Sequence, residues 1–190
     1  HSFPTRRSSD LIYINHNTNI YDKIVINMKK PSQITEMKLI VNNFIPFNNS
    51  KLMCFFGNIY IRKKTYDRWV KDEEKGRNED DKNHEMTHVK QAIKCHNSWI
   101  LYYLHYIWLY LKNLPIINGI KMPYKFIEFE LEAYAHQYDN NYNIIHKDGT
   151  DEWKIFKKLT LKQKKQLYKQ YKESKLTFTN FINEKIMPIL

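Results

Sequence analysis

Residues 84–88 of the chain read His-Glu-Met-Thr-His, an H-E-x-x-H sequence. On a helix, residues four apart lie on the same face, so the imidazoles of His84 and His88 can reach one metal ion. The Glu85 carboxylate can then take a proton from a metal-activated water without occupying a coordination position. A chain of this composition contains such a match by chance about 0.02 times. The motif therefore predicts a Zn²⁺ site with His84 and His88 as ligands and Glu85 as general base.

A catalytic zinc site also needs a third protein ligand and one open position. The candidates are four histidines and two carboxylates of a predicted later helix: His96, His105, His136, His146, Glu130 and Glu132. In that helix Glu130 and Glu132 point about 200° apart. Glu130 shares a face with Ile127 and Tyr134 that we expect to be buried, whereas Glu132 lies beside Glu128 on a face expected to be more solvated. Because a buried carboxylate needs a compensating charge, we predict Glu130 as the third ligand.

Three further side chains are assigned to the surroundings of the ligands. Gln91, seven residues after His84, falls on the metal face of its helix and can hydrogen-bond a ligand or substrate, although an ordinary polar position fits equally well. We place Glu132 in the same outer layer. Tyr134 is predicted as a catalytic residue that orients a ligand histidine or polarises a substrate carbonyl, with simple packing as its alternative.

The order of these motifs resembles that of gluzincin-type zinc peptidases, which carry an H-E-x-x-H helix and a later E-x-E-A helix. Minigluzincins and membrane-bound CAAX-type endopeptidases belong to this group. A closer similarity is to short uncharacterised proteins of Bacteroidetes-type bacteria, and it covers roughly residues 37–141. It rests on MKLIVNNFIP (37–46), IYIRK (59–63), NHEMTHVKQ (83–91) and FELEAY (129–134).

The resemblance implies Glu130 as the third ligand and a small N-terminal β-structure followed by a helical part that carries the zinc site. It also favours Met37 as the start of the protein. Two positions depart from the pattern. Tyr134 stands where gluzincins usually have an aspartate, and Leu131 stands where the Bacteroidetes-type proteins often carry a basic residue.

The elements that must position these residues are strands first and helices afterwards, which predicts an α+β fold. Residues 37–41 (MKLIV) are predicted as a strand. Residues 52–61 (LMCFFGNIYI) are predicted as one bulged strand or a tight hairpin with Gly57 and Asn58 in its middle.

Helices are predicted over about 79–96, with acidic residues in the first turn, over 98–112 with Ser98 as the N-cap, and from Pro123 to about residue 138. The Lys-rich segment 153–175 is predicted as an exposed helix. The last residues, 176–190, are expected to form a tail that is a short helix or frayed.

We expect four parts in the chain. Residues 1–11 (HSFPTRRSSDL) look like a translated sequencing adapter and are excluded from fold reasoning. Residues 12–36 precede Met37, the expected start, with Met28 as the alternative. Residues 37–175 are expected to form a single metallopeptidase-like domain, a length that can bury a core. Residues 176–190 complete the chain as the tail.

The formal net charge is +11, and +10 without the first eleven residues. The excess is nearly all lysine. Lysine, asparagine, isoleucine and tyrosine share AT-rich codons, so base composition accounts for the excess without a nucleic-acid partner. Two cysteines, Cys54 and Cys95, cannot form a disulfide framework and fit a reducing compartment, which favours the cytoplasm.

Residues 97–111 (NSWILYYLHYIWLYL) contain no charged side chain. A membrane span needs about 20 apolar residues, and this run is shorter. A helix that is apolar on all sides is more often buried in a core, so we expect a core helix. Membrane association through this segment is the alternative.

Three functions follow from these features. The first is a zinc peptidase acting on a peptide or protein substrate, which we expect. The second is a metal-binding fold without proteolysis, in which Tyr134 or His136 closes the site as a fourth ligand. The third is a membrane- or nucleic-acid-associated protein that binds through 154–175.

Overall fold

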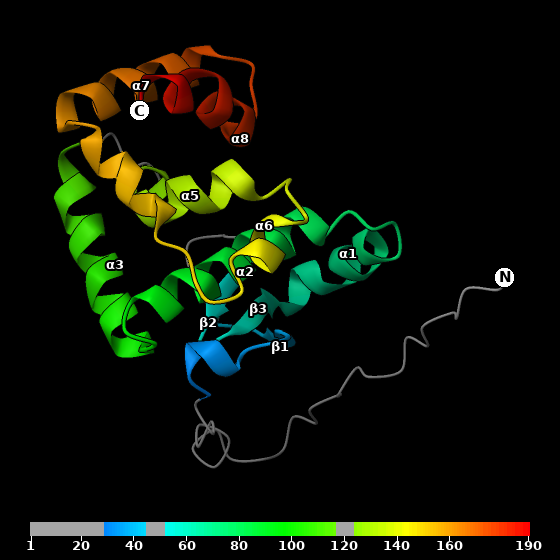
Figure 1. Cartoon of the computed structure of the whole chain (residues 1–190). Helices are drawn as coiled ribbons and strands as arrows, with labels where there is room; N and C mark the ends of the chain where they lie inside the picture. Colours follow the sequence, from blue (N-terminus) through cyan, green and yellow to red (C-terminus); the bar gives the residue numbers. More distant parts are fainter. Residues whose placement is uncertain (1–28, 45–51, 117–123) are drawn as a thin grey trace, which may run out of the picture.

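The computed structural model describes residues 29–44, 52–116 and 124–190. The adapter-like segment, Met28 and Pro123 lie outside the described residues. The architecture is α+β, as predicted: a small sheet comes first, and a mostly helical part follows (Figure 1).

The sheet has three strands, β1 (Lys38–Asn42), β2 (Leu52–Phe55) and β3 (Asn58–Arg62), in the order β1-β3-β2. β1 is parallel to β3, and β2 is antiparallel to β3. The tight-hairpin alternative for residues 52–61 is therefore confirmed. Its two-residue turn, Phe56-Gly57, has φ angles of 49° and 72°, which is the positive-φ pair that a type I′ turn requires.

The helical part contains α1 (Lys63–Glu73), α2 (Glu79–Lys94), α3 (Trp99–Asn113), α5 (Glu128–His136), α6 (Tyr142–Ile145), α7 (Leu161–Glu173) and α8 (Phe178–Phe181). Shorter helical turns are η1 (Pro31–Gln33), η2 (Leu114–Ile116), η3 (Glu152–Lys158), η4 (Ile182–Ile186) and η5 (Met187–Ile189). The predicted helices over 79–96 and 98–112 correspond to α2 and α3. Ser98 caps α3 as predicted, because its side chain accepts a hydrogen bond from the backbone N–H of Leu101.

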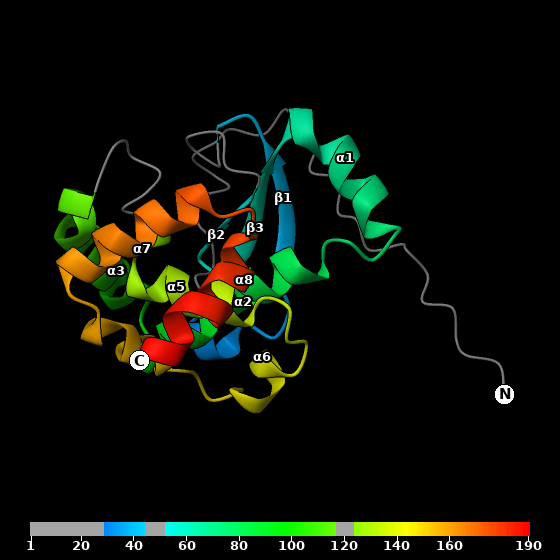
Figure 2. The ribbon, with the colours of Figure 1, turned by 90° about the horizontal axis from the view of Figure 1, so that it is seen from above.

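α5 occupies the centre of the helical part, with α2 on one side and the C-terminal helices on the other (Figures 1 and 2). It contributes to two hydrophobic clusters. Leu131 and Ala135 pack with α7, α8 and η4, and Phe129 packs with residues of α2 and α3. Nearly every residue of α5 is buried for this reason, including all three of its glutamates.

One expectation about the C-terminal region changes. The segment 153–175 is not one exposed helix: it divides at Thr160, which forms a capping box with Gln163 at the start of α7, and Lys164 is buried. Residues 176–190 contain short helices, which confirms the short-helix alternative for the tail. They insert Phe178, Phe181 and Ile182 into the cluster beside α5, because a chain end with these apolar side chains gains more from burial than from solvation.

α3 was expected to be buried on all sides as a core helix. One of its faces is buried, but the other is not. Trp99, Tyr102 and Leu109 are buried, but the opposite side of α3 is apolar and exposed. No helix among the described residues is long and apolar enough to cross a membrane.

Candidate metal centre

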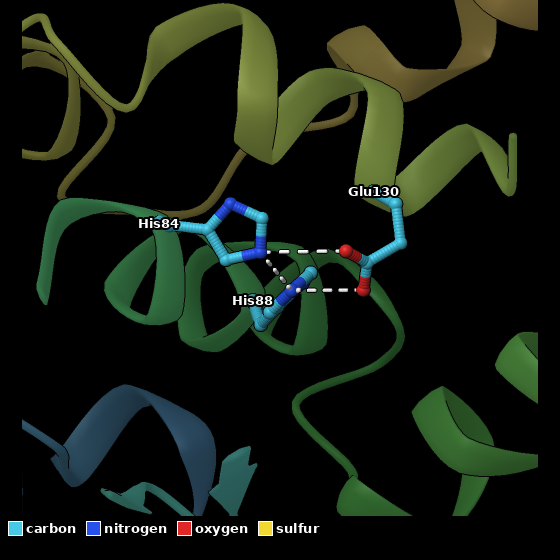
Figure 3. A group of neighbouring side chains, drawn as sticks. All are labelled: His84, His88 and Glu130. Atoms are coloured by element: carbon cyan, nitrogen blue, oxygen red, sulfur yellow. Dashed lines mark hydrogen bonds and ion pairs between the residues drawn. The ribbon is translucent and has the colours of Figure 1, made fainter. Parts of the chain in front are cut away.

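Two neighbouring helices bring the three predicted ligands together (Figure 3). α2 presents His84 and His88 one turn apart, and α5 presents Glu130 from the opposite side. All three side chains are buried. The structure therefore contains a His-His-Glu group that can hold a metal ion, built from segments more than forty residues apart in sequence.

The spacing of the ligand atoms is regular. Nε2 of His84 lies 3.3 Å from Glu130 Oε2, and Nε2 of His88 lies 3.2 Å from Glu130 Oε1. The two Nε2 atoms are 3.3 Å apart. An ion about 2.0 Å from each of its tetrahedral ligands keeps those ligands about 3.3 Å apart. Each imidazole nitrogen therefore faces a different oxygen of the Glu130 carboxylate, and the two nitrogens are at a separation that one small ion can bridge.

The electrostatics of the group favour a cation at the same point. Burial disfavours the imidazolium of His88, but the negative charge of Glu130 and its hydrogen bond outweigh this and raise the pKa of His88 to about 9. Burial likewise acts against the Glu130 carboxylate, yet the charge of His88 and hydrogen bonds from both histidines hold its pKa well below the usual range. Oε2 of Glu130 is buried, and apart from its 3.3 Å contact with Nε2 of His84 it has no hydrogen-bond partner within the described chain. A metal ion would supply the missing partner and replace the proton on His88.

A buried hydrogen-bond relay fixes the orientation of His88. The Gln91 amide group donates to the backbone oxygen of Phe129 at 2.8 Å and to Glu132 Oε2 at 2.6 Å. Its carbonyl oxygen must then face Nδ1 of His88, 2.9 Å away. Nδ1 therefore carries a hydrogen, which leaves Nε2 as the ring nitrogen that faces the metal position and can bind the ion once its own proton is lost.

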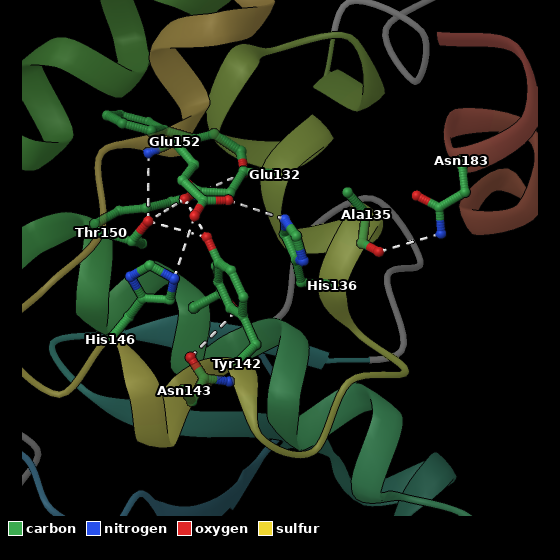
Figure 4. Close-up of polar contacts among 12 residues, drawn as sticks. Glu132, Ala135, His136, Tyr142, Asn143, His146, Thr150, Glu152 and Asn183 are labelled. Carbon is green, nitrogen blue, oxygen red and sulfur yellow. Dashed lines mark hydrogen bonds and ion pairs between the residues drawn. The ribbon is translucent and has the colours of Figure 1, made fainter. Parts of the chain in front are cut away.

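The prediction that Glu132 faces solvent is wrong. Its side chain is fully buried, and the hydroxyls of Tyr142 and Thr150 both donate to its Oε1 (Figure 4). Burial raises the pKa of Glu132, and these hydrogen bonds together with that from Gln91 oppose the rise. The helical-face argument failed because α5 is surrounded on all sides, so no face of it is solvated.

Glu85 lies beside the ligands and is also buried. Its Oε2 accepts a hydrogen bond from the backbone N–H of Cys54 in β2 at 2.8 Å. Burial raises the pKa of Glu85, while the charges of His84 and His88 oppose that rise. The carboxylate is thus held close to the three ligands by an edge strand of the sheet.

Tyr134 contacts the group through its ring. The ring lies edge-on to that of His84, with centroids 4.4 Å apart, and packs against Phe178 on its other side. Nδ1 of His84 is buried without a hydrogen-bond partner in the described part of the chain. Tyr134 therefore does not orient His84 through a hydrogen bond, as the aspartate at this position of the gluzincin pattern would orient a ligand histidine.

Two tyrosines near Glu130 were not predicted. The hydroxyl of Tyr106 in α3 donates to Glu130 Oε1 at 2.7 Å. Desolvation and the nearby charge of Glu130 raise the pKa of Tyr124. A sequence signal existed for Tyr106, because a tyrosine on the inner side of an apolar helix needs a polar partner for its hydroxyl. That signal does not name the partner.

The other candidate histidines lie elsewhere. His105 packs against Phe129 and Trp153. His136 and His146 direct their Nε2 atoms at the two oxygens of Glu152, at 3.3 Å and 3.2 Å (Figure 4). His96 is exposed just after α2. Within the described ranges, no fourth His, Cys, Asp or Glu joins the metal-binding group.

Comparison with known proteins adds no further assignment. No protein-family model matches the chain, and no significant match exists among curated proteins or solved structures. The resemblance to gluzincins accordingly stays a prediction.

Proposed function

We propose that the chain is a zinc-dependent peptidase that hydrolyses peptide bonds with His84, His88 and Glu130 as ligands and Glu85 as general base. The observation that carries this proposal is the convergence of both Nε2 atoms, 3.3 Å apart, on the Glu130 carboxylate, each nitrogen lying 3.2–3.3 Å from one of its two oxygens. These separations suit Zn²⁺ at about 2.0–2.1 Å from imidazole nitrogen and carboxylate oxygen. Two histidines and a glutamate form a donor set known from catalytic zinc sites.

The absence of a fourth ligand among the described residues supports catalysis over a structural role, because structural zinc sites are closed by four protein ligands. Bound zinc supplies Lewis acidity and lowers the pKa of a water molecule to about 7. Glu85 accepts a proton from the attacking water while the oxygen of that water bonds to the carbonyl carbon of the substrate. The same carboxyl group then delivers that proton to the leaving amine nitrogen as the peptide C–N bond breaks. The raised pKa of Glu85 suits both steps.

The substrate would lie along the sheet. β2 is an edge strand, it packs against α2, and the backbone N–H of Cys54 points from it towards Glu85. An extended peptide that adds to the free edge of β2 would therefore run past Glu85. We assign the carbonyl side of such a peptide to the hydroxyls of Tyr134 and Tyr124, because the charges of Glu130 and Glu85 act on both.

The proposal is tested by zinc content and peptide cleavage measured on the same preparations. The unaltered protein should bind one zinc per chain and cleave a mixed peptide library. Glu85→Gln should keep the metal and lose cleavage by about 100-fold or more, since general base catalysis contributes that much. Glu130→Ala and His88→Ala should lose the metal.

The second candidate function is a metal-binding fold without proteolysis, which the burial of all three ligands favours. It predicts stoichiometric zinc and no cleavage by the unaltered protein. Zinc with no cleavage of any library peptide would therefore replace the first function by the second. A protein purified without zinc that also fails to bind added zinc would exclude both.

A further inference from the structure

An apolar stripe runs along the outer side of α3, the helix at the left edge of the molecule in Figure 1. The stripe consists of Ile100, Leu101, Leu104, Ile107, Trp108 and Leu111, each between 45% and 66% exposed. Their spacing places all six on one helix face. The single charged residue of α3 is Lys112, at its C-terminal end.

α3 cannot bury this stripe by turning over, because its other side is already fixed. Trp99, Tyr102 and Leu109 are buried in the core. The hydroxyl of Tyr103 accepts a hydrogen bond from the backbone N–H of Phe56 in the β2–β3 turn, and that of Tyr106 donates to Glu130. A contiguous apolar surface on a rigid helix of this kind marks an interaction site.

Positive charge borders the stripe. Lys112 ends it, with a side chain that is 53% exposed and an Nζ that lies 3.9 Å from Oε1 of the buried Glu128. Lys157 is exposed and close enough to His105 of α3 for its charge to lower the pKa of that histidine, after the larger effect of burial. The whole chain carries a formal charge of +11. An apolar helix face with a large exposed tryptophan and a lysine border is the pattern of helices that lie in the plane of a membrane surface.

We propose that the exposed face of α3 docks the protein on an anionic lipid surface, with the helix parallel to the bilayer. Negative headgroups complement the lysines and the net charge of the chain, whereas a second copy would bring like charges together. Docking of this kind does not need a spanning helix. It also places the metal centre close to the lipid, because Tyr106 on the inner side of α3 contacts Glu130 and a helix is only about 10 Å across.

Tryptophan fluorescence tests the proposal directly on the full chain. Of the four tryptophans, Trp69, Trp99 and Trp153 are buried, so a change in emission reports on Trp108. Vesicles of phosphatidylcholine and phosphatidylglycerol in equal amounts should shift the emission to the blue. Bromine-labelled acyl chains should quench it. Binding should weaken with added salt and with vesicles of phosphatidylcholine alone.

A pair of matched variants identifies the surface. Leu104→Glu with Ile107→Glu should weaken vesicle binding more than about tenfold, because two charges would enter the apolar layer. Ile144→Glu with Ile145→Glu is the control. These α6 residues are 71% and 72% exposed and lie outside the stripe, so their substitution should leave binding within about twofold.

Three results would overturn the proposal. One is the absence of a fluorescence shift with any vesicle. Another is an equal loss of binding in the two double variants. The third is a dimer in sedimentation experiments that Leu104→Glu with Ile107→Glu dissociates, together with no vesicle binding, which would assign the stripe to a second copy of the chain.

Discussion

Oε1 of Gln91 lies 2.9 Å from Nδ1 of His88, and the amide group of Gln91 is held on its other side by Glu132. The oxygen of this glutamine cannot turn away without breaking both bonds of its amide group. One buried side chain thus determines which nitrogen of His88 is free for a metal. This relation leads to the first prediction.

Gln91→Met keeps the volume of the side chain and removes its hydrogen bonds. We expect zinc affinity to fall by about 10–100-fold, the usual effect of losing a group that orients a ligand histidine. Competition with a chromophoric chelator measures the affinity. Gln166→Met on the exposed side of α7 is the control and should bind zinc as tightly as the unaltered protein. Equal affinities in the two variants would show that His88 needs no orientation by Gln91.

Lys164 and Glu128 form a buried ion pair, with Nζ 3.1 Å from Oε1. Nζ also donates to Asn113 and to the backbone oxygen of Phe126. Burial lowers the pKa of Lys164, and the charge of Glu128 opposes that effect. Lys164→Met removes the buried cation and leaves Glu128 only the more distant, half-exposed Lys112, whose Nζ lies 3.9 Å from Oε1. We therefore expect a loss of about 3 kcal/mol in the free energy of unfolding, the lower end of the range for a broken buried ion pair.

Urea denaturation followed by circular dichroism measures that loss. Lys165→Met is the matched control, because Lys165 is the exposed neighbour, and it should change stability by no more than about 0.5 kcal/mol. Similar midpoints for the two variants would mean that the buried pair contributes no net stability.

His136 should make the protein less stable in acid. Burial lowers its pKa in the folded state below the usual 6.5, against the opposing charge of Glu152. The unfolded chain therefore binds a proton more readily than the folded chain, and stability falls as the pH drops below 6.5. His136→Gln removes this titration, so the stability difference between pH 7 and pH 5 should be smaller in the variant. Parallel pH profiles from thermal unfolding would contradict this prediction.

Neither cysteine should react readily in the native protein. Burial raises the pKa of Cys95 to about 11, and it raises that of Cys54 well above its usual value, with the charge of Glu85 adding to the effect. Only the thiolate is nucleophilic, so Ellman's reagent at pH 8 should modify neither residue until denaturant is added. Rapid modification of one thiol before unfolding would show an open path to that cysteine.

The H-E-x-x-H motif and the hairpin were predictable from the sequence because both depend on neighbouring residues. Four-residue spacing determines the helix face of His84 and His88, and a glycine inside an apolar run indicates a tight turn. The turn itself is Phe56-Gly57, one residue before the predicted Gly57-Asn58, because Asn58 already pairs with Phe55 in the sheet. Glu130 was predicted as the ligand in preference to Glu132, and Glu130 is the glutamate that contacts the two histidines. The expected burial of Glu130 was correct, but the expected solvation of Glu132 was not, because both glutamates are buried.

Other parts of the site depend on tertiary contacts that the sequence does not reveal. Glu128 pairs with Lys164 and Lys112, Glu130 contacts the two histidines, and Glu132 accepts hydrogen bonds from Gln91 and Tyr142. These partners lie on other elements, namely α2, α3, α6 and α7. Local periodicity predicts that the acidic face of such a helix is solvated. In the folded protein this face is buried because other elements surround α5 on all sides. The exposed apolar side of α3 was missed for the same reason.

The position of α5 between two hydrophobic clusters has a consequence for how sequences of this kind can vary. Inserting or deleting one residue at the start of α5 would turn the following side chains by about 100° about the helix axis. Such a change would separate Lys164, the histidines and Gln91 from their glutamates in a single step. Length changes at the start of α5 should therefore be tolerated far less than in surface turns, and homologues with an intact centre should align here without gaps.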